Sequence, residues 1–198
     1  MSITVSKTRD ILVDVARQLF ARMGVDHTTM NDIARASQKG RRTLYTYFKS
    51  KDDLFLAVVE SELDKLNQSL RDIAAKALRA DEKLITFIYT RLDAVKAIVF
   101  RNGTLRARFF RDIWRVEKAR KKFDCQEIEI LKKILEDGIQ EGTFRIPDTG
   151  ITALILHHAL KGLEVPYIRG FMGSSEADLA DHKKNVVNLI FNGIKIMK

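Results

Sequence analysis

The sequence SQKGRRTLYTYFKSKDDL, residues 37–54, places five cations and three aromatic side chains close together near the front of a 198-residue chain. Its middle fits a helical period, because Leu44 and Phe48 lie four residues apart and share one face. We expect these two side chains to be buried against Phe20 and Ile33. The stretch therefore predicts a short helix over residues 41–47 with one anchored side and one exposed, cationic side.

Two helix-start signals frame this stretch. Thr29 with Asp32, and Ser50 with Asp53, each have the spacing of a capping box, in which a hydroxyl and an acid satisfy backbone amides at a helix start. A short helix after Thr29, a polar turn and the helix over residues 41–47 together make a helix-turn-helix. The second helix of such a unit can enter the major groove of DNA.

The exposed face of the helix over residues 41–47 carries side chains suited to reading bases. Arg42 has a planar fork for guanine, and threonine offers a hydroxyl and a methyl group to base edges. Hydroxyl and ammonium groups around the helix are suited to phosphates. The predicted DNA-binding residues are Thr29, Lys39, Arg41, Arg42, Thr43, Tyr45, Thr46, Tyr47, Lys49 and Lys51. The alternative is a charged, solvated surface on a helical bundle, which is the usual role of a run of cations.

Apolar residues recur three and four apart along nearly the whole chain, which predicts an all-α protein. We expect an N-terminal three-helix helix-turn-helix domain over residues 1–50 and a helical effector-binding and dimerisation domain over residues 51–198. About nine helices are predicted. Their ranges are 7–23, a short segment after residue 29, 41–47, 52–78, 82–100, 104–121, 123–141, 149–169 and 176–197.

Composition restricts the function. The formal net charge is +9, and six of these charges lie within residues 1–51, which favours a polyanionic partner for that part. One cysteine excludes an internal disulfide, and no long apolar segment indicates secretion or membrane spanning, so we expect a cytoplasmic protein. We find no catalytic arrangement, no cofactor motif and no metal-ligand spacing, and therefore predict no enzyme, no cofactor and no metal.

Residues 7–60 resemble the DNA-binding domain of the tetracycline-repressor (TetR) family of transcription regulators. The matching segments are ARQLFARMGVDHTTMNDIARAS and TLYTYFKSKDDLFLAV, and EDGIQEGTF further on resembles the end of that family's seventh helix. The turn departs from the family pattern of alanine, glycine, valine and serine, because this chain has Ser37, Gln38, Lys39 and Gly40. The resemblance implies a C-terminal domain that binds a small molecule and forms a homodimer.

The residues of the last two predicted helices are compatible with that dimer. In ITALILHHALKGLEV, residues 151–165, apolar side chains lie on two faces, so one face can pack on the home core and the other on a second copy. A deeply buried monomer core is the alternative. The ligand-binding candidates are Phe87, Phe109, Phe110, Trp114 and His158, although aromatics at helical spacing are more often core. His157 and His158 diverge by about 100° on a helix, which disfavours one shared metal.

We therefore predict a sequence-specific transcription regulator, a repressor released by an unknown small-molecule effector, that acts as a homodimer on a palindromic double-stranded DNA operator. A helical carrier or sensor of hydrophobic anions without specific DNA binding is the alternative. A protein that coats DNA irrespective of sequence is a second alternative, and its affinity would fall with salt on every sequence alike.

Overall fold

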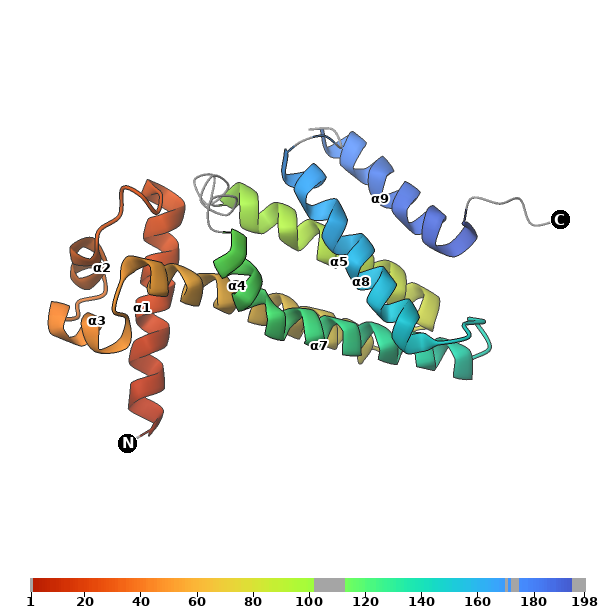
Figure 1. Cartoon of the computed structure of the whole chain (residues 1–198), viewed down its shortest axis with the longest axis horizontal. Coiled ribbons are helices and arrows are strands. Elements are labelled where there is room, and N and C mark those ends of the chain that lie inside the picture. The colour runs from red at the N-terminus through yellow and green to blue at the C-terminus, as the bar shows by residue number, and fades with distance from the viewer. Residues whose placement is uncertain (1, 102–112, 170, 172–174, 194–198) are drawn as a thin grey trace. The chain divides into compact units, whose positions relative to one another are not determined.

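A computed structural model describes residues 2–101, 113–169, 171 and 175–193 of the chain, and within them every regular element is an α-helix (Figure 1). The all-α prediction is thereby confirmed. The eight helices of the described residues are α1 (Ser2–Met23), α2 (Met30–Ala36), α3 (Arg41–Tyr47), α4 (Lys51–Ala74), α5 (Ala80–Arg101), α7 (Ile113–Gln140), α8 (Thr149–Arg169) and α9 (Glu176–Asn192).

One predicted helix boundary needs correction. Separate helices over residues 104–121 and 123–141 were expected, but α7 is a single helix of 28 residues that passes through this point. The local sequence KKFDCQ contains no glycine or proline to break it. Residues 102–112, which include the start of the first of these predicted helices, lie outside the described residues.

The chain divides into two compact units. The first comprises residues 1–65 and 98–123, and the second comprises residues 66–97 and 124–198. Both α4 and α7 begin in the first unit and end in the second. The domain boundary expected at residue 50 stays a prediction.

The core of the first unit explains why α3 stands where it does. Leu44 and Phe48 are almost completely buried, in one hydrophobic cluster with Phe20 and Ile33. This confirms the predicted anchored side of the short helix. Because α2 and α3 are only seven residues long each, burial of these side chains rather than helix propensity holds them in place.

Local hydrogen bonds set the ends of these short helices. Thr29 and Asp32 form the predicted capping box of α2, and the Ser50 hydroxyl accepts a hydrogen bond from the Asp53 backbone amide at 3.1 Å. In the turn between α2 and α3, Gln38 has a φ of +54°. That left-handed conformation suits glycine, and a Cβ makes it costly. The glycine missing from the turn is therefore replaced by a residue that adopts the glycine conformation under strain.

The second unit is built from α5, α8, α9 and the later parts of α4 and α7. Its apolar core contains Phe87, Ile88, Leu131, Ile134 and Leu135, each nearly inaccessible to solvent. Figure 1 shows α9 running in the opposite direction to α8. In the described part of the chain, no helix has the length and apolar character needed to cross a membrane.

Candidate functional site

The exposed face of α3 carries the side chains that the sequence predicted for it. Arg41, Arg42, Tyr45 and Thr46 are exposed, with 43% of the Tyr45 surface accessible, whereas Leu44 between them is fully buried. Thr43 and Tyr47 are half-buried. The buried Leu44 and the row of exposed donors therefore lie on different faces of α3. The exposed donors can reach another molecule.

Contacts within α3 hold this row in order. The Thr46 hydroxyl donates a hydrogen bond to the Arg42 carbonyl at 2.9 Å, which ties this side chain to the preceding turn of α3. The Arg41 guanidinium lies 6.0 Å from the centre of the Tyr45 ring, within range of a cation–π interaction. The Arg42 guanidinium forms no ion pair with any described residue, so its fork of donors is available to a ligand.

The flanking candidates are positioned by different contacts. The Thr29 hydroxyl donates to Asp32 Oδ2 at 2.6 Å and accepts from the Asp32 amide at 3.2 Å. Hydrogen bonds donated by the Thr29 hydroxyl and by the Thr29 backbone amide lower the pKa of the Asp32 carboxyl. Lys51 donates to the Asp26 carbonyl at 3.3 Å, which ties the start of α4 to the loop before α2. Lys49 is exposed and Lys39 is half-buried.

In the part of the chain that the structure describes, the ligand-binding candidates do not line one common pocket. Phe87 is completely buried in the apolar core of the second unit, and His158 is exposed on α8. Phe109 and Phe110 lie outside the described residues, as does the side chain of Trp114. Their role in ligand binding stays a prediction.

The second unit also contains a buried polar cluster that the sequence analysis did not identify. Arg91 on α5 is 1% exposed, and its Nε lies 3.0 and 3.1 Å from the two carboxylate oxygens of Glu127 on α7. Its Nη2 also pairs with Glu164 on α8. His157 on α8 is likewise 1% exposed and approaches Glu127. One signal was visible in the sequence: Glu127 occupies the helical position between the apolar residues Phe123 and Ile130, where a charge should face the core.

A shallow groove of about 620 Å³ also lies on the second unit, lined by residues at the end of α4 and in α7. Ala74, Cys125 and Ile130 contribute to its mostly apolar wall. The Cys125 thiol is exposed there. The groove contains none of the five predicted ligand-binding residues.

Comparison with known proteins extends these observations. Residues 12–58 match the family described as bacterial regulatory proteins, tetR family. The transcriptional repressor KstR2 of Rhodococcus jostii is 31% identical over 149 residues, which cover 71% of this chain and 69% of KstR2. A transcriptional regulator from Cytophaga hutchinsonii has a solved structure that matches with a TM-score of 0.76 and 27% identity, covering 92% of this chain and 95% of that one.

A further solved structure, that of FadR from Bacillus subtilis in complex with stearoyl-CoA, has the same fold. It matches with a TM-score of 0.66 and 19% identity, and covers 93% of this chain and 98% of that one. The matches to whole chains therefore continue well past residue 58 into the helices of the second unit.

Proposed function

Because this chain belongs to the TetR family of transcriptional regulators, we propose that it is a homodimeric repressor of a palindromic operator, released from DNA by a small-molecule effector. The family is a helix-turn-helix DNA-binding family and not an enzymatic one, which confirms the predictions of a regulator and of no enzyme. Its members bind DNA and small-molecule effectors, as FadR binds stearoyl-CoA. The operator, the release mechanism and the dimer interface are the proposal. Its place of action is the cytoplasm, where bacterial DNA lies.

The observation that carries the operator proposal is the exposed row on α3. Arg42 can donate two parallel hydrogen bonds, which guanine O6 and N7 can accept. Thr46 has a methyl group that a thymine can contact. The buried Leu44 and Phe48 fix the helix behind this row, so the row is presented on a rigid support. We assign Arg42, Thr43, Tyr45 and Thr46 to base contacts. Thr29, Lys39, Arg41, Tyr47, Lys49 and Lys51 are assigned to phosphate contacts, which set register but not sequence.

Exposed apolar side chains on the last two helices support the dimer. On α8, 58% of Ile151, 43% of Leu154 and 61% of Ile155 are accessible, and on α9 the figure for Leu189 is 55%. Leaving large aliphatic side chains in water is unfavourable, and a second copy would bury them. A two-fold interface of this kind would set two α3 helices to read half-sites about 34–36 Å apart, or a multiple of that spacing.

The release mechanism rests on α4. This helix starts at Lys51, three residues after the core residue Phe48, and ends at Ala74 in the second unit. An effector that binds more tightly when α4 is in one of two positions can therefore change the separation of the two α3 helices in a dimer. Such a shift is limited by the difference in effector affinity between the two states.

Selection of bound duplexes from a random pool at a stated salt concentration tests the operator. We expect an enriched inverted repeat for the unaltered protein. Arg42→Ala should lose preference at one base pair of each half-site, at a cost of about 1–3 kcal/mol in binding. Arg71→Ala removes an exposed arginine of the second unit and serves as the matched control. If Arg42→Ala and Arg71→Ala select the same sequences as the unaltered chain, the assignment of α3 is wrong.

The same experiment separates the two alternatives. A carrier of hydrophobic anions would enrich no duplex, whereas a sequence-independent DNA binder would retain all duplexes at low salt and release all of them together as salt rises. Spin labels on the two α3 helices test the release mechanism. An effector that frees operator DNA without changing the distance between the labels would contradict it.

A further inference from the structure

We propose that Asp124, Glu127 and His157 form a binding site for a divalent transition-metal ion such as Zn²⁺. One possible ligand atom from each of the three side chains lies within 4.8 Å of the other two, and all three residues belong to the second unit. The proposal goes beyond operator binding and does not depend on it.

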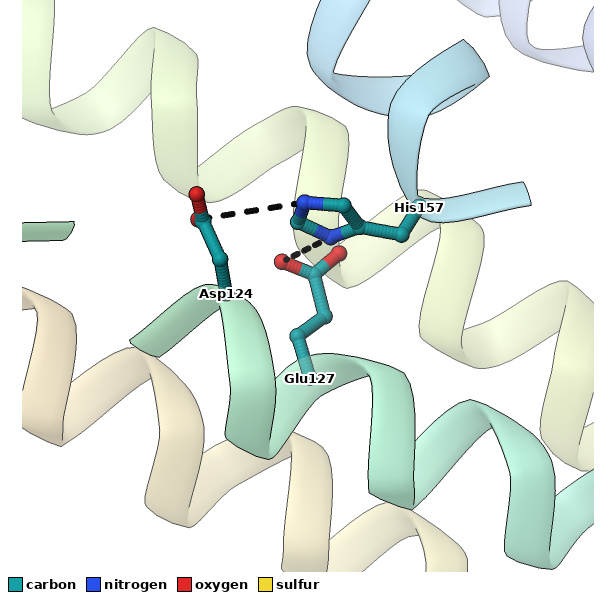
Figure 2. A group of neighbouring side chains, drawn as sticks. All are labelled: Asp124, Glu127 and His157. Atoms are coloured by element: carbon teal, nitrogen blue, oxygen red, sulfur yellow. Dashed lines mark ion pairs between the residues drawn. The ribbon is translucent and has the colours of Figure 1, made fainter. Parts of the chain in front are cut away.

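Two helices bring the three side chains together. Asp124 and Glu127 are three residues apart on α7 and share one face of it, and His157 comes from α8. Nδ1 of His157 is 3.5 Å from Oε2 of Glu127, and Nε2 is 3.9 Å from Oδ1 of Asp124. Figure 2 shows both carboxylates turned toward the imidazole ring.

The buried imidazole itself points to a ligand. His157 is 1% exposed, and neither of its ring nitrogens makes a hydrogen bond to any described residue. A neutral imidazole carries one donor and one acceptor, and leaving both unmatched in the interior is unfavourable. Its distances to the carboxylates are longer than hydrogen bonds. A metal ion bound by one imidazole nitrogen and by carboxylate oxygens would satisfy that nitrogen. The imidazole and the carboxylates would then not need to form a hydrogen bond with each other.

The surrounding charges orient the two carboxylates. Lys161 Nζ is 2.8 Å from Oδ2 of Asp124, and the opposite oxygen of that carboxylate is the one nearer the histidine. Arg91 Nε contacts both oxygens of Glu127, including the Oε2 that faces the histidine, and Arg91 also pairs with Glu164. Outer partners of this kind fix the orientation of metal-binding carboxylates.

The ligand types select the class of ion. One imidazole nitrogen with two carboxylate oxygens suits Zn²⁺ and similar transition metals, whereas Mg²⁺ and Ca²⁺ prefer oxygen alone. In a tetrahedral site with bonds of about 2.0–2.2 Å, neighbouring ligand atoms are about 3.4 Å apart. The separation of 3.5 Å between His157 and Glu127 is close to this value. The 3.9 Å separation of Asp124 is from the other ring nitrogen, Nε2, so the partly buried Asp124 carboxylate has to turn to share one ion with Glu127, within the 4.8 Å that separates the ligand atoms.

The test uses the full chain, cleared of metal with a chelator and titrated with Co²⁺ and then with Zn²⁺. We expect one Co²⁺ per chain, the visible absorption of a tetrahedral site, and displacement of Co²⁺ by Zn²⁺. His157→Ala should weaken Co²⁺ binding at least tenfold. The neighbouring His158→Ala is the matched control, since His158 is exposed and lies outside the group, and it should bind as the unaltered chain does.

Asp124→Ala provides a second variant if His157→Ala does not fold, as judged by circular dichroism, and it too should bind Co²⁺ at least tenfold more weakly. The proposal is overturned if the unaltered chain binds no Co²⁺, or if both folded variants bind as it does. If only the His158→Ala variant loses Co²⁺ binding, the ion binds at the surface, and the proposal is overturned in that case too.

Discussion

The ring of Phe144 lies against Gly138, so closely that a Cβ at position 138 would be 2.9 Å or less from three of its ring atoms. The loop after α7 produces this approach, because the amides of Thr143 and Phe144 both donate hydrogen bonds to the Gly138 carbonyl. On its other side the Phe144 ring contacts Phe191 of α9, with the ring centres 6.1 Å apart. Gly138 thus allows one aromatic ring to connect the end of α7 with α9.

Gly138→Ala should therefore destabilise the protein. In most helix interiors, replacement of glycine by alanine stabilises by up to about 1 kcal/mol. Here the added methyl group would meet the Phe144 ring, and forcing it in should cost about 1–3 kcal/mol. Thermal or urea unfolding measures the change. In the Phe144→Ala background the same replacement should lose its cost, and an equal cost in both backgrounds would show that the ring is not responsible.

Gln38→Gly should stabilise the turn between α2 and α3. The φ of +54° at Gln38 disfavours a side chain, and glycine adopts it without that penalty, so we expect a gain of about 1 kcal/mol in the free energy of unfolding. Gln38→Ala retains the Cβ and is the control, with no gain expected. Equal unfolding midpoints for the two variants would argue against strain at this position.

Asp137 links stability to pH. A hydrogen bond from Lys133, at 2.6 Å, lowers the pKa of the Asp137 carboxyl, and Lys83 contributes from 3.5 Å. Because this pKa is lower in the folded than in the unfolded chain, the stabilisation is present above the unfolded value near 4 and is lost as the pH falls through the folded value.

Asp137→Asn should accordingly lose about 1–2 kcal/mol at pH 7, since the mostly buried Lys83 loses its ionic partner. The difference from the unaltered chain should shrink below pH 4. Urea unfolding at several pH values measures both effects. Asp81→Asn removes a solvent-exposed pair with Arg79 and should have a smaller effect at every pH. A constant deficit from pH 7 to pH 3 would contradict the pKa argument.

Ile155→Glu should convert the proposed dimer into a monomer. The side chain is 61% exposed on α8, so a charge there leaves the isolated fold intact but cannot be buried against a second copy. Light scattering after size-exclusion chromatography measures the mass, and operator affinity should fall with it. Leu78→Glu, at an exposed apolar residue outside α8 and α9, is the control. An unchanged mass for Ile155→Glu would place the interface elsewhere.

Several features of α2 and α3 were predictable because they depend on neighbours in sequence. Leu44 and Phe48 four residues apart define a buried face, and the acid three residues after Thr29 defines a helix start. The junction near residue 122 was not predictable in the same way. Whether a helix continues or breaks at a segment without glycine or proline depends on the helices it packs against, and α7 continues there.

Three properties could be predicted from the sequence alone: the all-α class, the helix-turn-helix, and the outward position of Arg42, Tyr45 and Thr46 on α3. These properties follow from side-chain periodicity and capping, whose range is one or two helical turns. Only the tertiary structure decided that Arg91 meets Glu127 and Glu164, which lie 36 and 73 residues away, and that His157 joins Asp124. Contacts between helices depend on how whole apolar faces pack, and a helical pattern read along one segment does not specify its partner.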